Sequence, residues 1–145
     1  MSAAVIPCLR YADAHAAIAW LVRAFGFEIN LVVPDAQGGI AHAQLLWRDA
    51  KRGHAMVMLG SAEPLGEFGR LMAQPLACEG RSTQSSYLIV DAIDAHHERA
   101  RAAGAEIVLP IVDQEYGGRG YTCRDLEGHL WSFGSYDPWG EENRA

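Results

Sequence analysis

The chain has 145 residues, of which 50% are hydrophobic and 21% are charged, and its net charge is −6. This length suits one ordinary domain, or two small halves that share a core. The acidic balance argues against a nucleic-acid partner, whose phosphates require a basic face. It is compatible with a cationic ligand, although many cytosolic proteins carry such a charge for solubility.

The three cysteines, Cys8, Cys78 and Cys123, are widely spaced and form no Cys-x-x-Cys motif. The spacing therefore predicts neither a structural zinc site nor a disulfide framework, and we expect Cys8 and Cys123 to pack as small apolar residues. The N-terminus lacks the charged and apolar regions of a signal peptide, and no stretch is long enough to span a bilayer. We expect a cytoplasmic protein with no membrane partner.

The first half of the chain predicts the order β-α-β-β-β. Asp13 is placed to cap a helix over residues 14–25, and Gly26 is placed to end it. The apolar residues of this helix recur at i, i+3, i+4 and i+7, which is typical of one buried stripe. The expected strands span residues 5–11, 27–33, 40–47 and 54–59.

Residues 62–83 form a connector with no clear period. It contains prolines and glycines, and it is long enough to be functional or mobile. Four apolar residues in it could form one helical turn that covers a groove: Leu65, Phe68, Leu71 and Met72.

The second half repeats the first. Ala-Phe-Gly-Phe-Glu-Ile at 24–29 parallels Ala-Ala-Gly-Ala-Glu-Ile at 102–107. Asp91 or Asp94 is predicted to cap a helix that ends at Gly104 and presents His96 and His97 on a solvated face. Pro110 is expected to end the strand that follows this helix. The predicted strands span residues 85–90, 106–109, 118–124 and 130–136.

An internal repeat implies that neither half buries its apolar face alone. We expect an α+β fold in which two tandem βαβββ modules, about residues 4–61 and 84–137, form a curved mixed sheet with helices on the outer face. The whole chain, 1–145, is then one domain, and its concave side is a groove suited to a small ligand.

Five segments in this order resemble the vicinal oxygen chelate superfamily, which includes glyoxalase I, bleomycin-resistance proteins and extradiol dioxygenases. The segments are IPCLRYAD at 6–13, AFGFE at 24–28, IAHAQ at 40–44, VMLGS at 57–61 and DLEGHLWSF at 125–133. The resemblance covers nearly the whole chain and is weakest in the connector. It implies paired βαβββ modules, usually assembled as a homodimer.

Metal-using members of that superfamily hold a divalent cation with four side chains, commonly histidine and glutamate. The resemblance places the equivalent positions here at Ile6, Met58, Ser85 and Ser132. None of these is a good ligand for a hard or borderline divalent metal. We therefore expect a protein without the usual metal site and without another cofactor.

Strand alternation predicts which side chains face the groove. It places His42 and Gln44 on one face of the third strand, with His42 either facing a ligand or serving as a satisfied or exposed histidine. His54 and His129 occupy equivalent turns, where a structural hydrogen bond is expected. The same parity directs three further groups into the groove, namely Met58, the pair Ser85 and Tyr87, and Ser132. This lining favours an organic, partly aromatic ligand, or else a filled core or dimer contact.

The glycine-rich segment 115–121 is a second candidate, because glycines let a loop approach a ligand closely or move as a lid. Arg119 could hold a carboxylate in a bidentate pair, and Tyr121 lies beside it in the sequence. The alternative is a tight connection with a surface arginine.

These residues favour a small-molecule binding protein of the bleomycin-resistance type, a homodimer that holds an aromatic or cationic ligand without metal. The alternatives are an enzyme, either a metal-dependent lyase, isomerase or dioxygenase or a metal-free variant with His42 as base, and an interaction module whose groove the connector closes.

Overall fold

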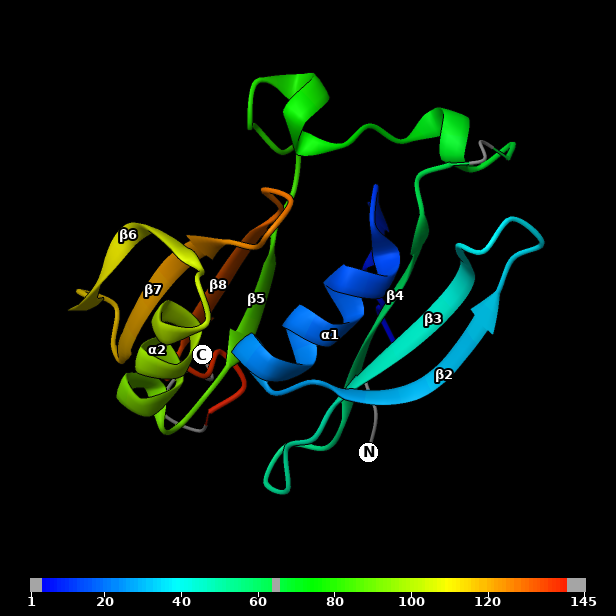
Figure 1. Cartoon of the computed structure of the whole chain (residues 1–145). Coiled ribbons are helices and arrows are strands. Elements are labelled where there is room, and N and C mark those ends of the chain that lie inside the picture. Colours follow the sequence, from blue (N-terminus) through cyan, green and yellow to red (C-terminus); the bar gives the residue numbers. More distant parts are fainter. Residues whose placement is uncertain (1–3, 64–65, 141–145) are drawn as a thin grey trace.

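The computed structural model describes residues 4–63 and 66–140, so the expectation for Leu65 lies outside the described residues. The first module forms one four-stranded sheet in the order β1-β4-β3-β2, with β1 parallel to β4 (Figure 1). Its elements are β1 (Cys8–Tyr11), α1 (Ala14–Phe25), β2 (Glu28–Pro34), β3 (Ile40–Trp47) and β4 (Ala55–Ser61).

The second module repeats this topology in the order β5-β8-β7-β6, with β5 parallel to β8. Its elements are β5 (Ser86–Ile89), α2 (Ile93–Ala102), β6 (Glu106–Asp113), β7 (Arg119–Arg124) and β8 (Leu130–Gly134). The predicted α+β fold class with paired βαβββ modules is therefore confirmed. Between the modules, the connector carries two 3-10 turns, Gly69–Leu71 and Pro75–Cys78. Among the described residues, no helix has the length and apolar character needed to cross a membrane.

The ends of α1 follow the sequence. The Asp13 side chain accepts a hydrogen bond from the Ala16 amide at 3.0 Å, and Gly26 ends the helix with φ of 91°. A positive φ of this kind favours glycine, because a Cβ would clash with the backbone.

The start of α2 differs from the prediction. Its N-cap is Ala92, and no side chain caps it. Asp91 instead bonds Arg52 at 2.8 Å, and Asp94 bonds Arg119 at 3.0 Å. Both carboxylates form ion pairs with arginines that are distant in the sequence. Local sequence patterns do not reveal such pairs.

Pro110 does not end β6, and that prediction is wrong. The strand continues from Glu106 to Asp113, with a shift in its pairing to β7 between Leu109 and Val112. A bulge on an outer strand tolerates proline because the missing N–H is not needed for the ladder.

The two modules share one core, and α1 lies between their sheets (Figure 1). The Phe25 ring, at the end of α1, lies 5.4 Å from that of Trp131 and 4.7 Å from that of Phe133. Phe27 also contacts Trp131, with the ring centroids 5.7 Å apart. These aromatic contacts bury the face that each module could not cover alone.

A buried carboxylate joins the modules at the other end of the core. Asp125 is 6% exposed, and its Oδ2 accepts hydrogen bonds from the Tyr11 hydroxyl at 2.6 Å and the Trp131 indole at 3.0 Å. Its Oδ1 accepts the amides of Glu127 and His129, each at 3.0 Å. Burial, and then the charge of Asp125, hold the Tyr11 pKa well above its usual value, so the phenol remains a donor.

The β7–β8 turn also forms hydrogen bonds with the residues just before α1. The Glu127 carboxylate accepts the amides of Ala12 and Asp13, at 2.6 and 2.9 Å. His129 Nε2 lies 2.9 Å from the Arg10 carbonyl, so Nε2–H is the donor. The β7–β8 turn therefore fixes the N-terminal strand of the other module.

His96 is buried at 8% exposure, so the prediction of a solvated face is wrong for this residue. Its Nε2 lies 3.0 Å from the Phe25 carbonyl and its Nδ1 lies 2.7 Å from the Tyr121 hydroxyl. A neutral ring satisfies both contacts, with Nε2–H donating and Nδ1 accepting. Burial lowers the His96 pKa to about 4.

We predict that replacing Asp125 by Asn lowers the free energy of unfolding by about 2–3 kcal/mol, since an amide nitrogen would face the Tyr11 and Trp131 donors. Urea unfolding monitored by tryptophan fluorescence measures the change. The Asp113 side chain is 86% exposed, and Asp113→Asn is the control, expected to change stability by less than about 0.5 kcal/mol. Equal effects of the two substitutions would contradict the role of Asp125.

His96 predicts a pH dependence of stability. Because its folded pKa of about 4 lies below the reference value of 6.5, the unfolded chain takes up the proton first as the pH falls. Its contribution is complete above pH 6.5 and is lost towards pH 4, up to about 3 kcal/mol. Urea midpoints across this range should fall less steeply for His96→Gln than for wild type or for the control His97→Gln. Parallel curves for all three proteins would refute this assignment.

Candidate functional site

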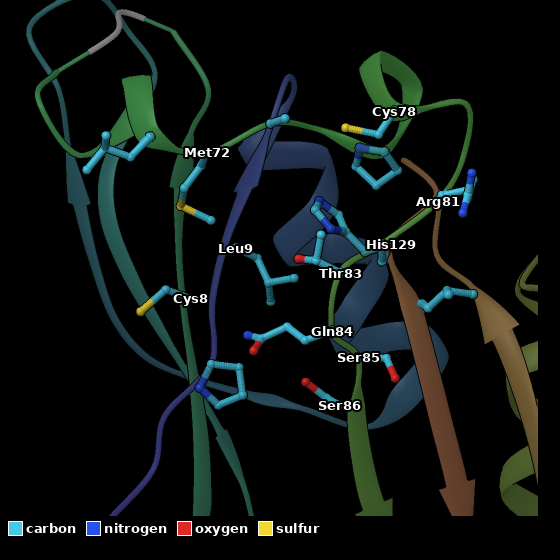
Figure 2. A pocket seen from close by; sticks show the side chains of 16 residues that line it. Cys8, Leu9, Met72, Cys78, Arg81, Thr83, Gln84, Ser85, Ser86 and His129 are labelled. Carbon is cyan, nitrogen blue, oxygen red and sulfur yellow. The ribbon is translucent and has the colours of Figure 1, made fainter.

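Two adjoining cavities, of about 620 and 610 Å³, lie between β1 and β5 beneath the connector, and Figure 2 shows the first of them. They share the residues at their centre, namely Pro7, Cys8, Met72, Gln84, Ser85 and Ser86. Together they form one cleft, here named the intermodule cleft. Each volume lies within the range of about 300–1,000 Å³ that is typical of small-ligand sites.

The first cavity has a polar wall on the side of the second module. The wall is a run of hydroxyl and amide side chains that leads into β5, namely Ser82, Thr83, Gln84, Ser85 and Ser86, with Arg81 before it. In Figure 2, Gln84 and Ser86 lie across from Cys8 on β1. These side chains offer donors and acceptors that could orient a ligand.

The second cavity is predominantly apolar and aromatic. Its walls come from both modules and from the connector, and its large side chains are Phe27, Trp47, Met56, Phe68, Met72, Tyr87 and Leu88. Methionine and aromatic side chains adapt to the faces of planar ligands. The Tyr87 hydroxyl donates to the Tyr136 carbonyl at 2.8 Å, and burial is the largest of the causes that raise its pKa to about 12.

The charge of the cleft differs from that of the whole protein. Its lining residues include Arg81 and no aspartate or glutamate. The net charge of −6 therefore belongs to other parts of the surface. A ligand in the cleft meets a neutral to weakly positive lining.

Of the sequence-predicted site residues, Ser85 and Tyr87 line the intermodule cleft. Four others lie outside its lining. Gln44 Nε2 is 3.0 Å from His42 Nε2, and the Ser132 hydroxyl is 2.8 Å from that of Thr122. Strand register places Met58 beside Cys8 and Gln44.

The structure places the remaining two predicted residues elsewhere. Tyr121 is 3% exposed and points at α2, where it bonds His96, so it does not share a face with Ser132. The Arg119 guanidinium pairs with Asp94 at 3.0 Å and Asp113 at 3.3 Å. The described structure therefore does not bring either residue to the cleft.

The sequence reasoning missed several lining residues. Cys8 was expected to pack in the core, but it is exposed and lines both cavities. His129 was expected to make only a structural bond; it makes one, and it also lines the first cavity. The apolar residues of the connector were the available signal for Phe68 and Met72. Nothing in the sequence indicated that Trp47 lines the cleft, because strand alternation on β3 does not show which module a side chain faces.

The positions that hold a metal in the resembling superfamily do not fit one here. Ile6 and Met58 offer no oxygen or nitrogen ligand, and the Ser132 hydroxyl is bonded to Thr122. Within residues 4–63 and 66–140, no group of three histidine, cysteine, aspartate or glutamate side chains is placed to hold a metal ion. No step of a reaction can therefore be assigned to a metal at these positions.

Comparisons with known proteins agree with this architecture. Residues 4–133 match the family model described as Glyoxalase/Bleomycin resistance protein/Dioxygenase superfamily. An uncharacterized protein of Mycobacterium bovis is 34% identical over 131 residues, which cover 90% of this chain and 82% of the relative.

Solved structures extend the comparison. The crystal structure of TioX from Micromonospora sp. ML1 is 37% identical, covers 91% of this chain and 97% of its own, and superposes with a TM-score of 0.64. A glyoxalase-related enzyme from Fulvimarina pelagi is 18% identical, with coverages of 94% and 88% and a TM-score of 0.66. At that identity the second likeness concerns the fold alone.

Proposed function

The chain belongs to the Glyoxalase/Bleomycin resistance protein/Dioxygenase superfamily, and we propose that it binds a small, partly aromatic organic ligand in the intermodule cleft without the family's usual metal. The observation that carries this proposal is the lining of the cleft. One wall consists of aromatic, methionine and leucine side chains, and the other consists of hydroxyl and amide side chains. Such a site binds an apolar body and orients it with a few polar contacts.

The alternative is a metal-dependent lyase, isomerase or dioxygenase of the same superfamily. Lewis-acid chemistry needs ligands that hold a cation against the substrate oxygens. Ile6, Met58, Ser85 and Ser132 supply two hydroxyls and no carboxylate or imidazole. The residues of this chain therefore support binding better than they support that chemistry.

A homodimer is also proposed, from the apolar residues on the outer strands. Ile29 on β2 is 58% exposed, and Leu109 on β6 is 60% exposed. Further exposed apolar side chains on these strands are Leu31, Val32, Val33 and Val112. Two outer strands with this character are typical of a surface that a second subunit covers.

We predict that a neutral aromatic probe, 2-naphthamide, binds wild type and that Ser85→Trp removes the binding, because the indole fills the centre of the cleft. Isothermal titration calorimetry measures both. Ala95 is exposed on α2 and outside the cleft lining, so Ala95→Trp is the control and should bind as wild type does. Unchanged affinity in Ser85→Trp would place the ligand elsewhere.

The same preparations separate binding from the metal-dependent alternative. Protein purified without chelator should contain substoichiometric metal by elemental analysis, and EDTA should leave both 2-naphthamide affinity and thermal stability unchanged. One tightly bound metal per chain, with loss of affinity on chelation, would favour the alternative.

For the dimer, sedimentation velocity should show a two-chain species for wild type. The double variant Leu31→Lys, Leu109→Lys should shift it towards the monomer, because charges placed inside an apolar interface are costly to desolvate. Ala95→Lys adds a charge on the exposed side of α2 and should leave the dimer intact. A monomeric wild type at micromolar concentration would refute the proposed homodimer.

A further inference from the structure

Arg10 differs from the arginines that polar contacts fix within the described chain. Six arginines have partners within the protein, namely Arg48, Arg52, Arg99, Arg101, Arg119 and Arg124. The Arg10 Nε is buried and has no hydrogen-bond partner, and its side chain forms no ion pair within residues 4–63 and 66–140.

The Arg10 side chain lies on the sheet rather than in solution. A Cβ built on Gly60 would come 2.6 Å from Arg10 Nη1, so the guanidinium occupies the space above this glycine of β4. Its Cζ is 5.9 Å from the centre of the Phe68 ring, which is a cation–π contact with the connector. The charge is therefore held in place between β4 and the connector.

A guanidinium in this position lacks the partner that its environment requires. A buried N–H without an acceptor loses its bond to water and gains nothing in return. Phe68 attracts the positive charge but accepts no hydrogen bond from Nε in this arrangement. The group that would complete the site is a planar anion, because a carboxylate matches the fork of N–H donors on arginine.

Arg10 is not among the lining residues of the intermodule cleft, but it adjoins two of them. Cys8 lines both cavities and shares a face of β1 with Arg10, since alternate residues of a strand point the same way. Phe68 lines the second cavity and also contacts the guanidinium. A ligand whose acidic group meets Arg10 would thus place its apolar body along the aromatic wall.

We propose that the ligand of the intermodule cleft is an aromatic carboxylic acid and that Arg10 binds its carboxylate. The proposal rests on the proposed function and assigns its ligand class. It accords with a lining that has Arg81 and no carboxylate, and it excludes the cationic ligand that the net charge suggested.

Three probes of similar shape test which ligand charge the cleft prefers. They are 2-naphthoate, 2-naphthamide and 2-naphthylmethylammonium. By calorimetry at low salt, wild type should bind the naphthoate about tenfold or more tightly than the amide, as expected for a charge-assisted hydrogen bond, and the ammonium most weakly. Arg10→Gln should bind naphthoate and amide alike, and Arg10→Lys should keep part of the preference.

Arg124→Gln is the matched control. Arg124 also has a buried Nε without a partner, but its guanidinium pairs with Glu106 at 3.3 Å and contacts the Gly80 carbonyl, and none of these residues lines the cleft. The substitution removes the same charge and should keep the tenfold preference. Loss of the preference in this control would attribute it to overall charge and overturn the proposal.

Other outcomes also test the Arg10 assignment and separate it from the proposed function. If wild type binds the amide as tightly as the naphthoate, or if Arg10→Gln keeps the preference, the Arg10 assignment fails while the proposed function stands. If none of the probes binds wild type, both fail. An unliganded Arg10→Met variant should melt no lower than Arg124→Met, since Arg10 loses only its contact with the Phe68 ring whereas Arg124 loses its pair with Glu106. A markedly lower melting temperature would show that the guanidinium is satisfied within the protein, and would also overturn the proposal.

Discussion

The buried carboxylate of Asp125 is the interaction on which the arrangement of the two modules depends. It accepts the Tyr11 hydroxyl from the first module and the Trp131 indole from the second. Removing a charge from water is costly unless every lone pair finds a donor, and two backbone amides of its own turn complete the set. Because Asp125 needs donors from both modules, it holds β1 against the β7–β8 turn. This contact also sets the position of β1 opposite β5, where the cleft lies.

At the opposite end of the modules, Arg52 forms a second set of polar contacts between them. Its guanidinium bonds Asp49 in its own turn, Asp91 after β5 and Asp137 after β8, at 2.9, 2.8 and 2.7 Å. The C-terminal end of α1 is held likewise, since Arg99 of α2 donates to the carbonyls of Val22 and Arg23. Polar contacts thus surround an aromatic core, and they restrict the modules to one relative orientation.

The repeated modules have diverged at one equivalent pair of glycines. In the second module, Tyr87 covers Gly134, with its hydroxyl 2.6 Å from where a Cβ would lie. In the first module, Arg10 covers Gly60. Both glycines leave room for a long side chain to lie flat on the sheet. One module thereby presents a phenol at the cleft and the other a cation beside it, which gives a symmetric fold an asymmetric site.

The sequence by itself determined the repeat, the order of elements and the ends of α1. These depend on near neighbours in the chain: the spacing of apolar residues, the cap at Asp13 and the glycine at 26. The expectation that the chain lacks the usual metal site depends on residue types at positions that the resemblance supplies, and it stays a prediction. Alternation along β5 did not separate the lining from the other face, because Ser86 and Leu88 line the cleft together with Ser85 and Tyr87.

Only the tertiary structure decided how the modules face one another. His96 is buried because α1 of the other module covers it, and Tyr121 is withdrawn from the groove because it bonds that histidine. Arg10 forms no ion pair with an acidic side chain of residues 4–63 or 66–140, which a strand pattern does not reveal. Such contacts join residues far apart in sequence, and their distances follow from packing rather than from local spacing.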